Sequence, residues 1–287
     1  MTKLAGKNVL ITGGAKGIGR LMALKIAQRS GNVVLWDIDR RGLTEVVDEI
    51  ERETGRKAHG YVCDVIDRTE VYEVATQVNA EVGAIDVLIN NAGVVSGKRL
   101  LETPDEKIEQ TFKVNTLALF WTAKAFLPSM VARNQGHIVT ISSVGGLIGS
   151  SKMVDYSASK YAAVGFEDSL RPELAQTAPG VKTLLVCPYY IDTGMFEGVK
   201  TRFSFLMPIL KEQYVASMIV RCIEKDRRRL VMPRFAYVGP ALKNLLPTPV
   251  FDFVINVFGG NECMEDFVGH AGRDQAAPHL KEVVNER

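Results

Sequence analysis

A glycine-rich turn joins two strongly patterned segments near the start of the chain, within NVLITGGAKGIGRLMALKIAQR at residues 8–29. The β-branched apolar run before the turn predicts a buried strand, and the segment after it has the pattern of a helix. In such a unit Gly13 permits the tight turn, Gly17 lets the backbone approach a pyrophosphate, and Gly19 lets helix and strand pack closely. The phosphates would then lie on the helix N-terminus, so the pattern predicts dinucleotide binding.

The alternation of strand and helix patterns continues over most of the chain. Strands are predicted at residues 8–12, 32–37, 58–64, 86–93, 136–143, 181–188 and 229–233, and helices at 17–29, 41–54, 68–82, 104–133, 155–176 and 211–225. The strands are continuous apolar runs, as expected when helices cover both faces of a parallel sheet. We therefore predict one α/β domain over residues 1–269, a doubly wound Rossmann-type fold with about seven parallel strands. It includes an apolar extension at 234–260, and a polar tail at 270–287 is expected to be mobile.

Composition and charge exclude several other classes of protein. The 35 basic and 33 acidic side chains give a net charge of +2, so no general attraction for nucleic acid is expected. The four cysteines are far apart, and none has a second cysteine or a histidine at ligand spacing. We expect free thiols in a cytoplasmic protein and no metal site. The sequence shows neither a signal-peptide pattern nor a transmembrane run, so we expect neither.

The end of the second predicted strand indicates which dinucleotide is bound. Asp37 lies there, 18 residues after Gly19. A carboxylate at this point can accept hydrogen bonds from the adenosine ribose hydroxyls and would repel a 2′-phosphate, which favours NAD. Lys16 can reach a phosphate and argues for NADP, which remains the alternative. We interpret Arg40 and Arg41 as part of a solvated helix start.

A tyrosine and a lysine four residues apart form a second motif, YSASK at residues 156–160. Tyr156 and Lys160 share one helix face near the carboxyl edge of the sheet, where open α/β sheets bind ligands. On its own this would be an ordinary surface pair. Beside a nicotinamide, two cations favour the phenolate, and lowering the phenol pKa by about 3 requires about 4 kcal/mol. Ser143, at the end of the preceding strand, is expected to hold the substrate oxygen while Tyr156 moves the proton.

In this order and spacing the motifs resemble those of the short-chain dehydrogenase/reductase family, over residues from about 5 to 235. The motifs are Thr12-Gly13-x-x-x-Gly17-x-Gly19, Asp64, NNAG at 90–93, Asn115, Ser143 and Tyr156-x-x-x-Lys160. The segment VCPYYIDTGMFEG and the C-terminal part are most similar to the branch that contains retinol and hydroxysteroid dehydrogenases.

The resemblance implies a role for each matching residue. Lys160 would also hold the nicotinamide ribose, Asn115 would support a water-linked proton relay, and Ser143 rather than Ser142 would be the catalytic hydroxyl. The residues expected to bind the cofactor are Gly13, Lys16, Gly17, Ile18, Gly19, Asp37, Asp64, Val65, Asn91, Ala92, Gly93, Tyr156, Lys160, Pro188, Ile191 and Thr193. Asp64 would cap the adenine pocket and Thr193 would bond the carboxamide. One departure is Pro188-Tyr189, where the family usually has Pro-Gly.

The segment at 189–210 is expected to lie over the active site. It is rich in aromatic and other apolar residues, which favours a lipophilic substrate that contacts Ser143, Tyr189 and Phe196. The alternative is that these side chains pack into the core or a subunit interface. Residues 234–260 are apolar but broken by prolines, and we expect them to close the substrate mouth or an interface rather than to lie on a membrane surface.

We therefore predict an NAD-dependent oxidoreductase that interconverts a lipophilic alcohol, such as retinol, a hydroxysteroid or a long-chain alcohol, with its carbonyl. The alternatives are an NADPH-dependent reductase of carbonyls or 3-oxoacyl thioesters, and a non-catalytic dinucleotide-sensing scaffold. The predicted helices at 104–133 and 155–176 carry more apolar side chains than one sheet face needs. We expect them to form a homodimer or homotetramer, with peripheral membrane contact as a further possibility.

Overall fold

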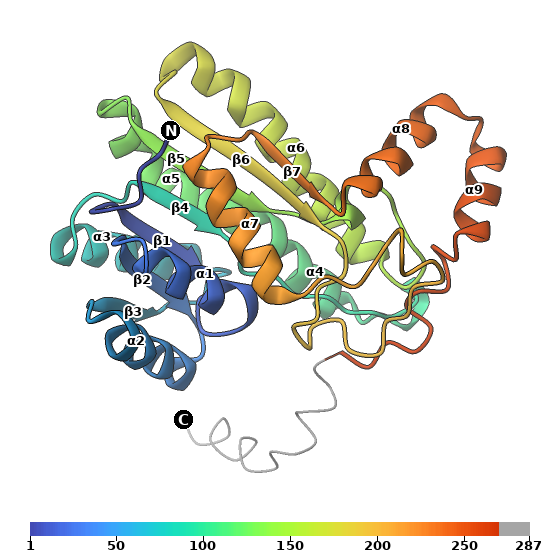
Figure 1. Ribbon diagram of the computed structural model, residues 1–287, viewed down its shortest axis with the longest axis horizontal. Helices are drawn as coiled ribbons and strands as arrows, with labels where there is room; N and C mark the ends of the chain where they lie inside the picture. Colours follow the sequence, from blue (N-terminus) through green and yellow to red (C-terminus); the bar gives the residue numbers. More distant parts are fainter. Residues whose placement is uncertain (270–287) are drawn as a thin grey trace.

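A seven-stranded parallel sheet forms the centre of the computed structural model, which describes residues 1–269 (Figure 1). The strands are β1 (Asn8–Thr12), β2 (Asn32–Asp37), β3 (Ala58–Val62), β4 (Val87–Asn90), β5 (Gly136–Ile141), β6 (Val181–Pro188) and β7 (Arg229–Met232). Their order in the sheet is β3-β2-β1-β4-β5-β6-β7. The direction of winding reverses between β1 and β4, and this reversal creates a crevice at the carboxyl ends of the strands. The predicted polar tail at 270–287 lies outside the described residues.

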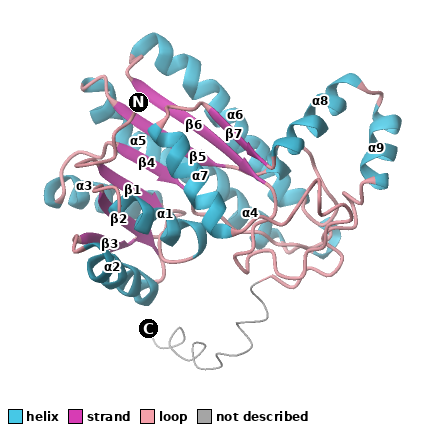
Figure 2. Ribbon diagram, in the orientation of Figure 1, coloured by secondary structure: helices cyan, strands magenta, loops and turns pink. Residues whose placement is uncertain are grey.

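Helices cover both faces of the sheet, as the continuous apolar strands predict (Figure 2). They are α1 (Gly17–Ala27), α2 (Arg40–Thr54), α3 (Arg68–Glu81), α4 (Asp105–Phe112), α5 (Ala118–Ala132), α6 (Val154–Thr177) and α7 (Glu212–Glu224). Successive strand residues point to opposite faces. Val9 and Ile11 therefore pack with the buried side chains of α1, α2 and α7, whereas Leu10 packs with those of α3, α5 and α6. Both faces of the central strands are buried, and the predicted doubly wound fold is confirmed.

A π-turn at Lys113–Leu117 interrupts the helix predicted at 104–133 and separates α4 from α5. Asn115 lies within this turn, and its amide pairs with the backbone of Val94: Nδ2 donates to the carbonyl at 2.9 Å and Oδ1 accepts from the N–H at 2.9 Å. Single π-turns in longer helices often occur at functional sites. Here the turn carries a polar side chain to the loop that follows β4.

The C-terminal segment forms an arm that projects from the body of the molecule (Figure 1). It consists of α8 (Val238–Leu245) and α9 (Thr248–Val257). Elsewhere in the chain, short 3₁₀ turns occur at Leu100–Glu102 and Val144–Gly146, and a third at Arg234–Tyr237 directly precedes α8. Pro249 lies in the first turn of α9, where a missing N–H costs no helical hydrogen bond. Lys243 anchors α8 to the body, because its Nζ donates to the Tyr161 hydroxyl at 2.7 Å.

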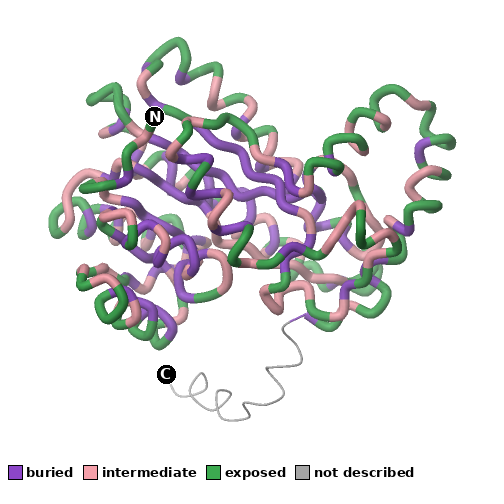
Figure 3. Tube along the Cα trace, viewed as in Figure 1, coloured by how far each residue is buried: buried purple, intermediate pink, exposed green. Residues whose placement is uncertain are grey.

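Figure 3 shows that the arm is mostly exposed, in contrast to the purple sheet. Gly239 of α8 lies so close to Ile148 that a Cβ atom there would be 2.2 Å from Ile148 Cδ1. The arm therefore has a close contact with the body at its base and an exposed far end. None of the helices in residues 1–269 combines the length and the apolar character needed to span a bilayer.

Candidate active site

The glycine-rich loop between β1 and α1 leaves no room for a side chain at Gly13 or Gly19. Gly13 has φ +66°, and a Cβ on Gly19 would be 2.0 Å from the Gly13 carbonyl oxygen. Gly17 also has positive φ, at +52°, and a Cβ there would approach only the Thr193 side chain. The loop thus brings backbone N–H groups at the start of α1 to an open surface, which fits the pyrophosphate of a dinucleotide.

A groove runs from this loop along the carboxyl edge of the sheet to the start of α6. Most of the predicted cofactor-binding residues line it: Gly13, Lys16, Gly17, Ile18, Gly19, Asp37, Asn91, Ala92, Gly93, Tyr156, Lys160, Pro188, Ile191 and Thr193. Asp64 and Val65 are not among the described residues that line the groove, because they lie in the turn after β3, where Asp64 Oδ1 accepts the Ile66 N–H at 3.1 Å.

Two carboxylates lie at the end of the groove where β2 finishes. Asp37 accepts hydrogen bonds from the N–H groups of Ala15 and Asp39, both at 3.0 Å. Lys16 forms an ion pair with Asp39 at 2.7 Å, and Asp39 also caps α2 through the Gly42 N–H. The capping bond and Lys16 together lower the pKa of Asp39. The one lysine predicted to favour NADP is therefore paired with an acid, and the local field suits ribose hydroxyls better than a 2′-phosphate.

Ser143 and Tyr156 meet where β5 and α6 approach each other. Ser143 follows β5, and its Oγ accepts the Gly145 N–H at 3.0 Å and lies 3.4 Å from the Pro188 carbonyl. The Ser142 hydroxyl is bound to the backbone of α6 instead, because its Oγ donates to the Lys160 carbonyl at 2.9 Å. Strand alternation therefore leaves only Ser143 facing the phenol. The ring of Tyr156 packs edge-on against Phe196, with centroids 5.9 Å apart.

Lys160 lies one helical turn beyond Tyr156 and is buried. Its Nζ donates to the Ile141 carbonyl at 3.0 Å and lies 5.8 Å from the centroid of the Tyr156 ring. Burial lowers the Lys160 pKa to about 8, while Cys187 acts in the opposite direction. An ammonium with a single carbonyl partner remains free to donate to a ligand hydroxyl in the groove.

The Tyr156 phenol is buried, and this shifts its pKa in the protein without a bound dinucleotide. Burial raises the pKa to about 12, Cys187 adds to the rise, and hydrogen bonding with Ser143 opposes it. The expectation that Lys160 and the nicotinamide together favour the phenolate stays a prediction. Desolvation disfavours the charged phenolate more than an ammonium nearly 6 Å from the ring can offset.

Asn115 supports the site from behind. Besides its two bonds to Val94, its Nδ2 donates to Ser159 Oγ at 3.0 Å. Asp155, next to Tyr156, accepts hydrogen bonds from Ser96 at 2.7 Å and from Thr111 at 2.9 Å. These bonds fix the first turn of α6 against the loop after β4 and against α4.

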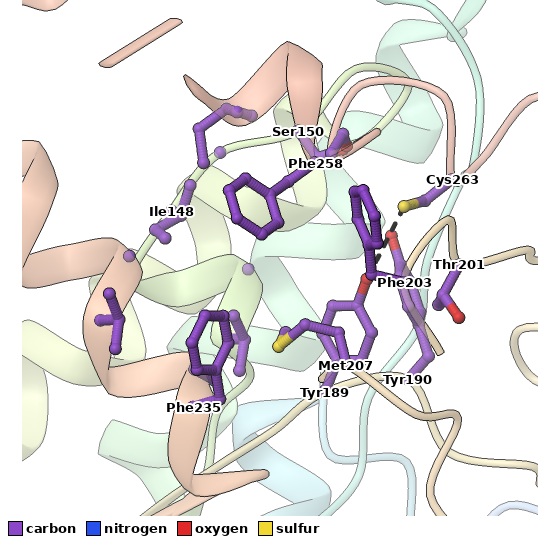
Figure 4. Close-up of a pocket in the computed structure, with 18 of the residues that line it drawn as sticks. Ile148, Ser150, Tyr189, Tyr190, Thr201, Phe203, Met207, Phe235, Phe258 and Cys263 are labelled. Atoms are coloured by element: carbon purple, nitrogen blue, oxygen red, sulfur yellow. Dashed lines mark hydrogen bonds between the residues drawn. The ribbon is translucent and has the colours of Figure 1, made fainter. Parts of the chain in front are cut away.

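An apolar cavity adjoins the groove, and Tyr189 is part of its wall (Figure 4). Ser143, Tyr189 and Phe196 line both spaces. The cavity contains about 1140 Å³ of empty space, part of it open to solvent. Its wall also includes Ile148, Ser150, Met153, Tyr190, Phe203, Met207 and Phe235 of the body, Leu242 of α8, Phe251, Val254 and Ile255 of α9, and Phe258 and Cys263. Figure 4 shows the Tyr189 hydroxyl turned toward Cys263 Sγ, 3.6 Å away.

Comparison with known proteins agrees with this geometry. Residues 7–202 match the family model of the short chain dehydrogenases. The chain belongs to this family. It is 45% identical to human epidermal retinol dehydrogenase 2 over 92% of this chain and 86% of the relative. It is 44% identical to bovine short-chain dehydrogenase/reductase family 16C member 6 over 92% of this chain and 84% of the relative.

Solved structures of two other dehydrogenases have the same fold. One from Burkholderia phymatum in complex with NAD superposes with a TM-score of 0.77 at 28% identity, over 85% of this chain and 95% of that one. An alcohol dehydrogenase from Thermococcus sibiricus, complexed with 5-hydroxy-NADP, gives 0.70 at 26% identity, over 79% and 94%. The resemblance inferred from the motifs is confirmed, including the similarity to retinol dehydrogenases.

Sequence reasoning missed part of the site of this short-chain dehydrogenase. Ile141, Ser142 and Met195 line the groove, and each is adjacent or close in sequence to a predicted residue. The residues of α8 and α9 in the cavity wall carry no motif. Their apolar content suggested a cover for the substrate mouth, but only the folded arm shows which side chains face the cavity.

Proposed function

We propose that this short-chain dehydrogenase interconverts a lipophilic alcohol and its carbonyl compound, with NAD as the cofactor. One observation carries the proposal: Ser143 and Tyr156 lie where a groove suited to a dinucleotide meets an apolar cavity. The names of the relatives, which are retinol dehydrogenases, support an alcohol with a large apolar body.

The residues of the groove divide the task of holding the cofactor. The N–H groups at the start of α1 would bind the pyrophosphate, Asp37 the adenosine ribose, and Lys160 the nicotinamide ribose. Bound NAD supplies the acceptor for the hydride of the alcohol carbon, and NADH supplies the hydride in the reverse direction. The pairing of Lys16 with Asp39 supports NAD over NADP.

Tyr156 and Ser143 act on the substrate oxygen. Ser143 Oγ, held by the Gly145 N–H, donates to that oxygen and fixes its position. As a neutral phenol Tyr156 can donate a proton to a carbonyl, whereas oxidation of an alcohol requires the phenolate as base. Because burial raises the Tyr156 pKa to about 12, oxidation needs added positive charge in the groove. Lys160 is placed to supply part of it, and the Asn115 amide would orient water on a path for the proton.

A panel of alcohols tests the proposal, with each alcohol assayed in the presence of NAD and of NADP. We expect NADH formation with retinol, hydroxysteroids and long-chain secondary alcohols, and poorer kcat/KM with short alcohols. Preference for NADPH with carbonyls or 3-oxoacyl thioesters would favour the reductase instead. Nucleotide binding without turnover of any substrate would leave a dinucleotide-sensing scaffold as the better description.

A homodimer through α5 and α6 is part of the proposal. Three apolar side chains near the starts of these helices are each more than 40% exposed: Leu117, Phe120 and Val154. The Phe120 ring of α5 packs edge-on against Phe166 of α6, with centroids 5.0 Å apart. This apolar surface supports a two-fold interface. Light scattering at micromolar concentration should give the mass of a dimer or tetramer, and a monomer would contradict the assignment.

The proposed function also includes peripheral membrane contact through the tip of the arm. Leu245 and Phe253 are 78% and 68% exposed, and the cavity that would take the lipophilic substrate lies between the arm and the body. We expect replacement of both residues by serine to reduce flotation with anionic liposomes. Unchanged flotation would limit the arm to its role as a cavity wall.

A further inference from the structure

We infer that Glu265 is a positioning residue that latches the C-terminal segment over the substrate cavity and thereby sets the affinity for bulky substrates. The segment in question comprises residues 259–268 and is called the strap below. The inference rests on the proposed function, because it concerns the substrate side of that site. It adds a specificity element that lies far from the sequence motifs of the reaction.

The strap contributes directly to the wall beside the reacting groups. Cys263 and Met264 are buried in one apolar cluster with Tyr156 and Tyr190. Cys263 also lines the cavity and faces the Tyr189 hydroxyl at 3.6 Å. Any displacement of the strap would open this wall, so the contacts that hold it also shape the substrate pocket.

Backbone contacts join the strap to the segment over the active site. The Val268 N–H donates to the Glu197 carbonyl at 2.9 Å, and the Lys200 N–H donates to the Cys263 carbonyl at 3.2 Å. These bonds make the strap and the segment around 197–200 a single cover. Glu265 attaches this cover to the rest of the molecule through ion pairs.

Glu265 bridges two loops of the body. Its carboxylate lies 2.7 Å from Lys152 Nζ and 3.1 Å from Arg99, and Lys152 also donates to the Glu265 backbone carbonyl at 3.1 Å. Arg99 belongs to the loop after β4, and Lys152 precedes α6, which carries Tyr156. The hydrogen bond and positive charge of Lys152 lower the Glu265 pKa, and the charge of Arg99 acts in the same direction. A single side chain thus ties the cover to the two segments that frame the site.

The backbone of Lys152 provides an independent indication. Its φ is +60°, a left-handed conformation that costs a residue with a Cβ free energy and persists only where surrounding contacts hold it. The side chain of Lys152 is only 16% exposed and ends at Glu265. A glycine would adopt this backbone without strain but would lack the latch, which separates the two contributions experimentally.

The experiment compares Glu265→Gln and Lys152→Gly with wild type, using retinol as the bulky substrate and isopropanol as the short one. Glu262→Gln is the matched control, because Glu262 is exposed on the same strap and no ion pair to it is seen among residues 1–269. We expect both latch variants to raise KM for retinol about 1.4- to fivefold, the range for partly exposed ion pairs. The control, and kcat/KM for isopropanol, should not change.

Two further readouts distinguish a latch from a general structural role. Raising ionic strength from about 0.05 to 0.5 M should increase the wild-type KM for retinol, because salt screens the ion pairs of Glu265. The latch variants lack an ion pair of Glu265, so their KM should change little. Lys152→Gly should unfold at no lower denaturant concentration than wild type, because it removes backbone strain.

Amide hydrogen exchange without substrate or cofactor tests the latch even if no alcohol is turned over. Exchange at residues 196–203 and 260–268 should be faster in both latch variants than in the Glu262→Gln control. Faster exchange in a protein that oxidises no alcohol would support the latch and refute the proposed function. Unchanged exchange together with an unchanged KM for retinol would overturn the latch.

Discussion

Replacing Lys160 by methionine should abolish turnover and yet stabilise the protein in the absence of cofactor. The ammonium of Lys160 is buried, and burial lowers its pKa from 10.5 to about 8. Each pKa unit corresponds to about 1.36 kcal/mol, so holding this charge costs the folded state about 3 kcal/mol near neutral pH. Lys160→Met also loses the hydrogen bond to the Ile141 carbonyl, which reduces the stabilisation by about 1 kcal/mol. We expect a net stabilisation of about 2 kcal/mol.

The sign of the pH dependence follows from the same values. Below about pH 8 the lysine is protonated in both the folded and the unfolded protein, so the penalty is complete. Between about 8 and 10.5 the unfolded state binds more protons, and the stability of the wild type rises with pH. Lys160→Met lacks this titration. Its advantage over wild type should therefore shrink to about 1 kcal/mol or less by pH 10.

Urea unfolding near pH 7 and near pH 10 measures this difference. Lys124→Met is the matched control, because Lys124 is exposed on α5 and its replacement removes a solvated charge. The control should change stability by less than about 0.5 kcal/mol at either pH. A Lys160→Met protein less stable than wild type near pH 7, or an advantage independent of pH, would refute the reasoning.

Three further substitutions address the groove and the proton transfer. Tyr156→Phe should reduce kcat about a hundred- to ten-thousandfold with NAD affinity nearly unchanged, as stopped-flow turnover and calorimetry would show; kcat within tenfold of wild type would rule out the assigned role. Asp37→Ala should raise the KM for NAD about tenfold and shift preference toward NADP, and a wild type that already prefers NADP would contradict this. Gly19→Ala places a Cβ 2.0 Å from the Gly13 carbonyl and should weaken NAD binding and cost about 1–3 kcal/mol in urea unfolding, whereas Gly165→Ala, with open space around it, should do neither.

The fold and the groove follow from local patterns in the sequence. The strand β1, the glycine turn and α1 are contiguous, and their pairing with β2 and β4 depends on apolar runs that a parallel sheet requires. Tyr156 and Lys160 are likewise four residues apart on one helix, so their relation needs no long-range information. What the motifs did not contain is the electrostatic environment. The direction of the Tyr156 pKa depends on burial by Phe196 and other distant residues, and the sequence does not specify this.

The individual contacts of the arm and the strap with the site escaped prediction for a different reason. Their contacts with the site join residues separated by 74 to 166 positions, such as Tyr189 with Cys263 and Arg99 with Glu265. Each is an ordinary pair with no recurring spacing. Periodicity reports which face of an element is buried but not what covers it. The apolar character of residues 234–260 was therefore visible, but its division between a cavity wall and an exposed tip was not.

Tyr189 shows how a departure from a family pattern acquires meaning in the structure. The family usually has glycine after Pro188, and a residue with a side chain at this position has less backbone freedom than glycine. Tyr189 is not among the non-glycine residues with positive φ in the described chain, and its N–H continues the sheet by donating to the Met232 carbonyl at 2.8 Å. The backbone thus has no need of glycine here. The ring instead forms the partition between the groove and the apolar cavity, packed on Tyr190 with centroids 4.5 Å apart. A residue that lines both spaces determines how close the body of a substrate lies to the nicotinamide end of the groove, so position 189 contributes shape to the site rather than backbone freedom.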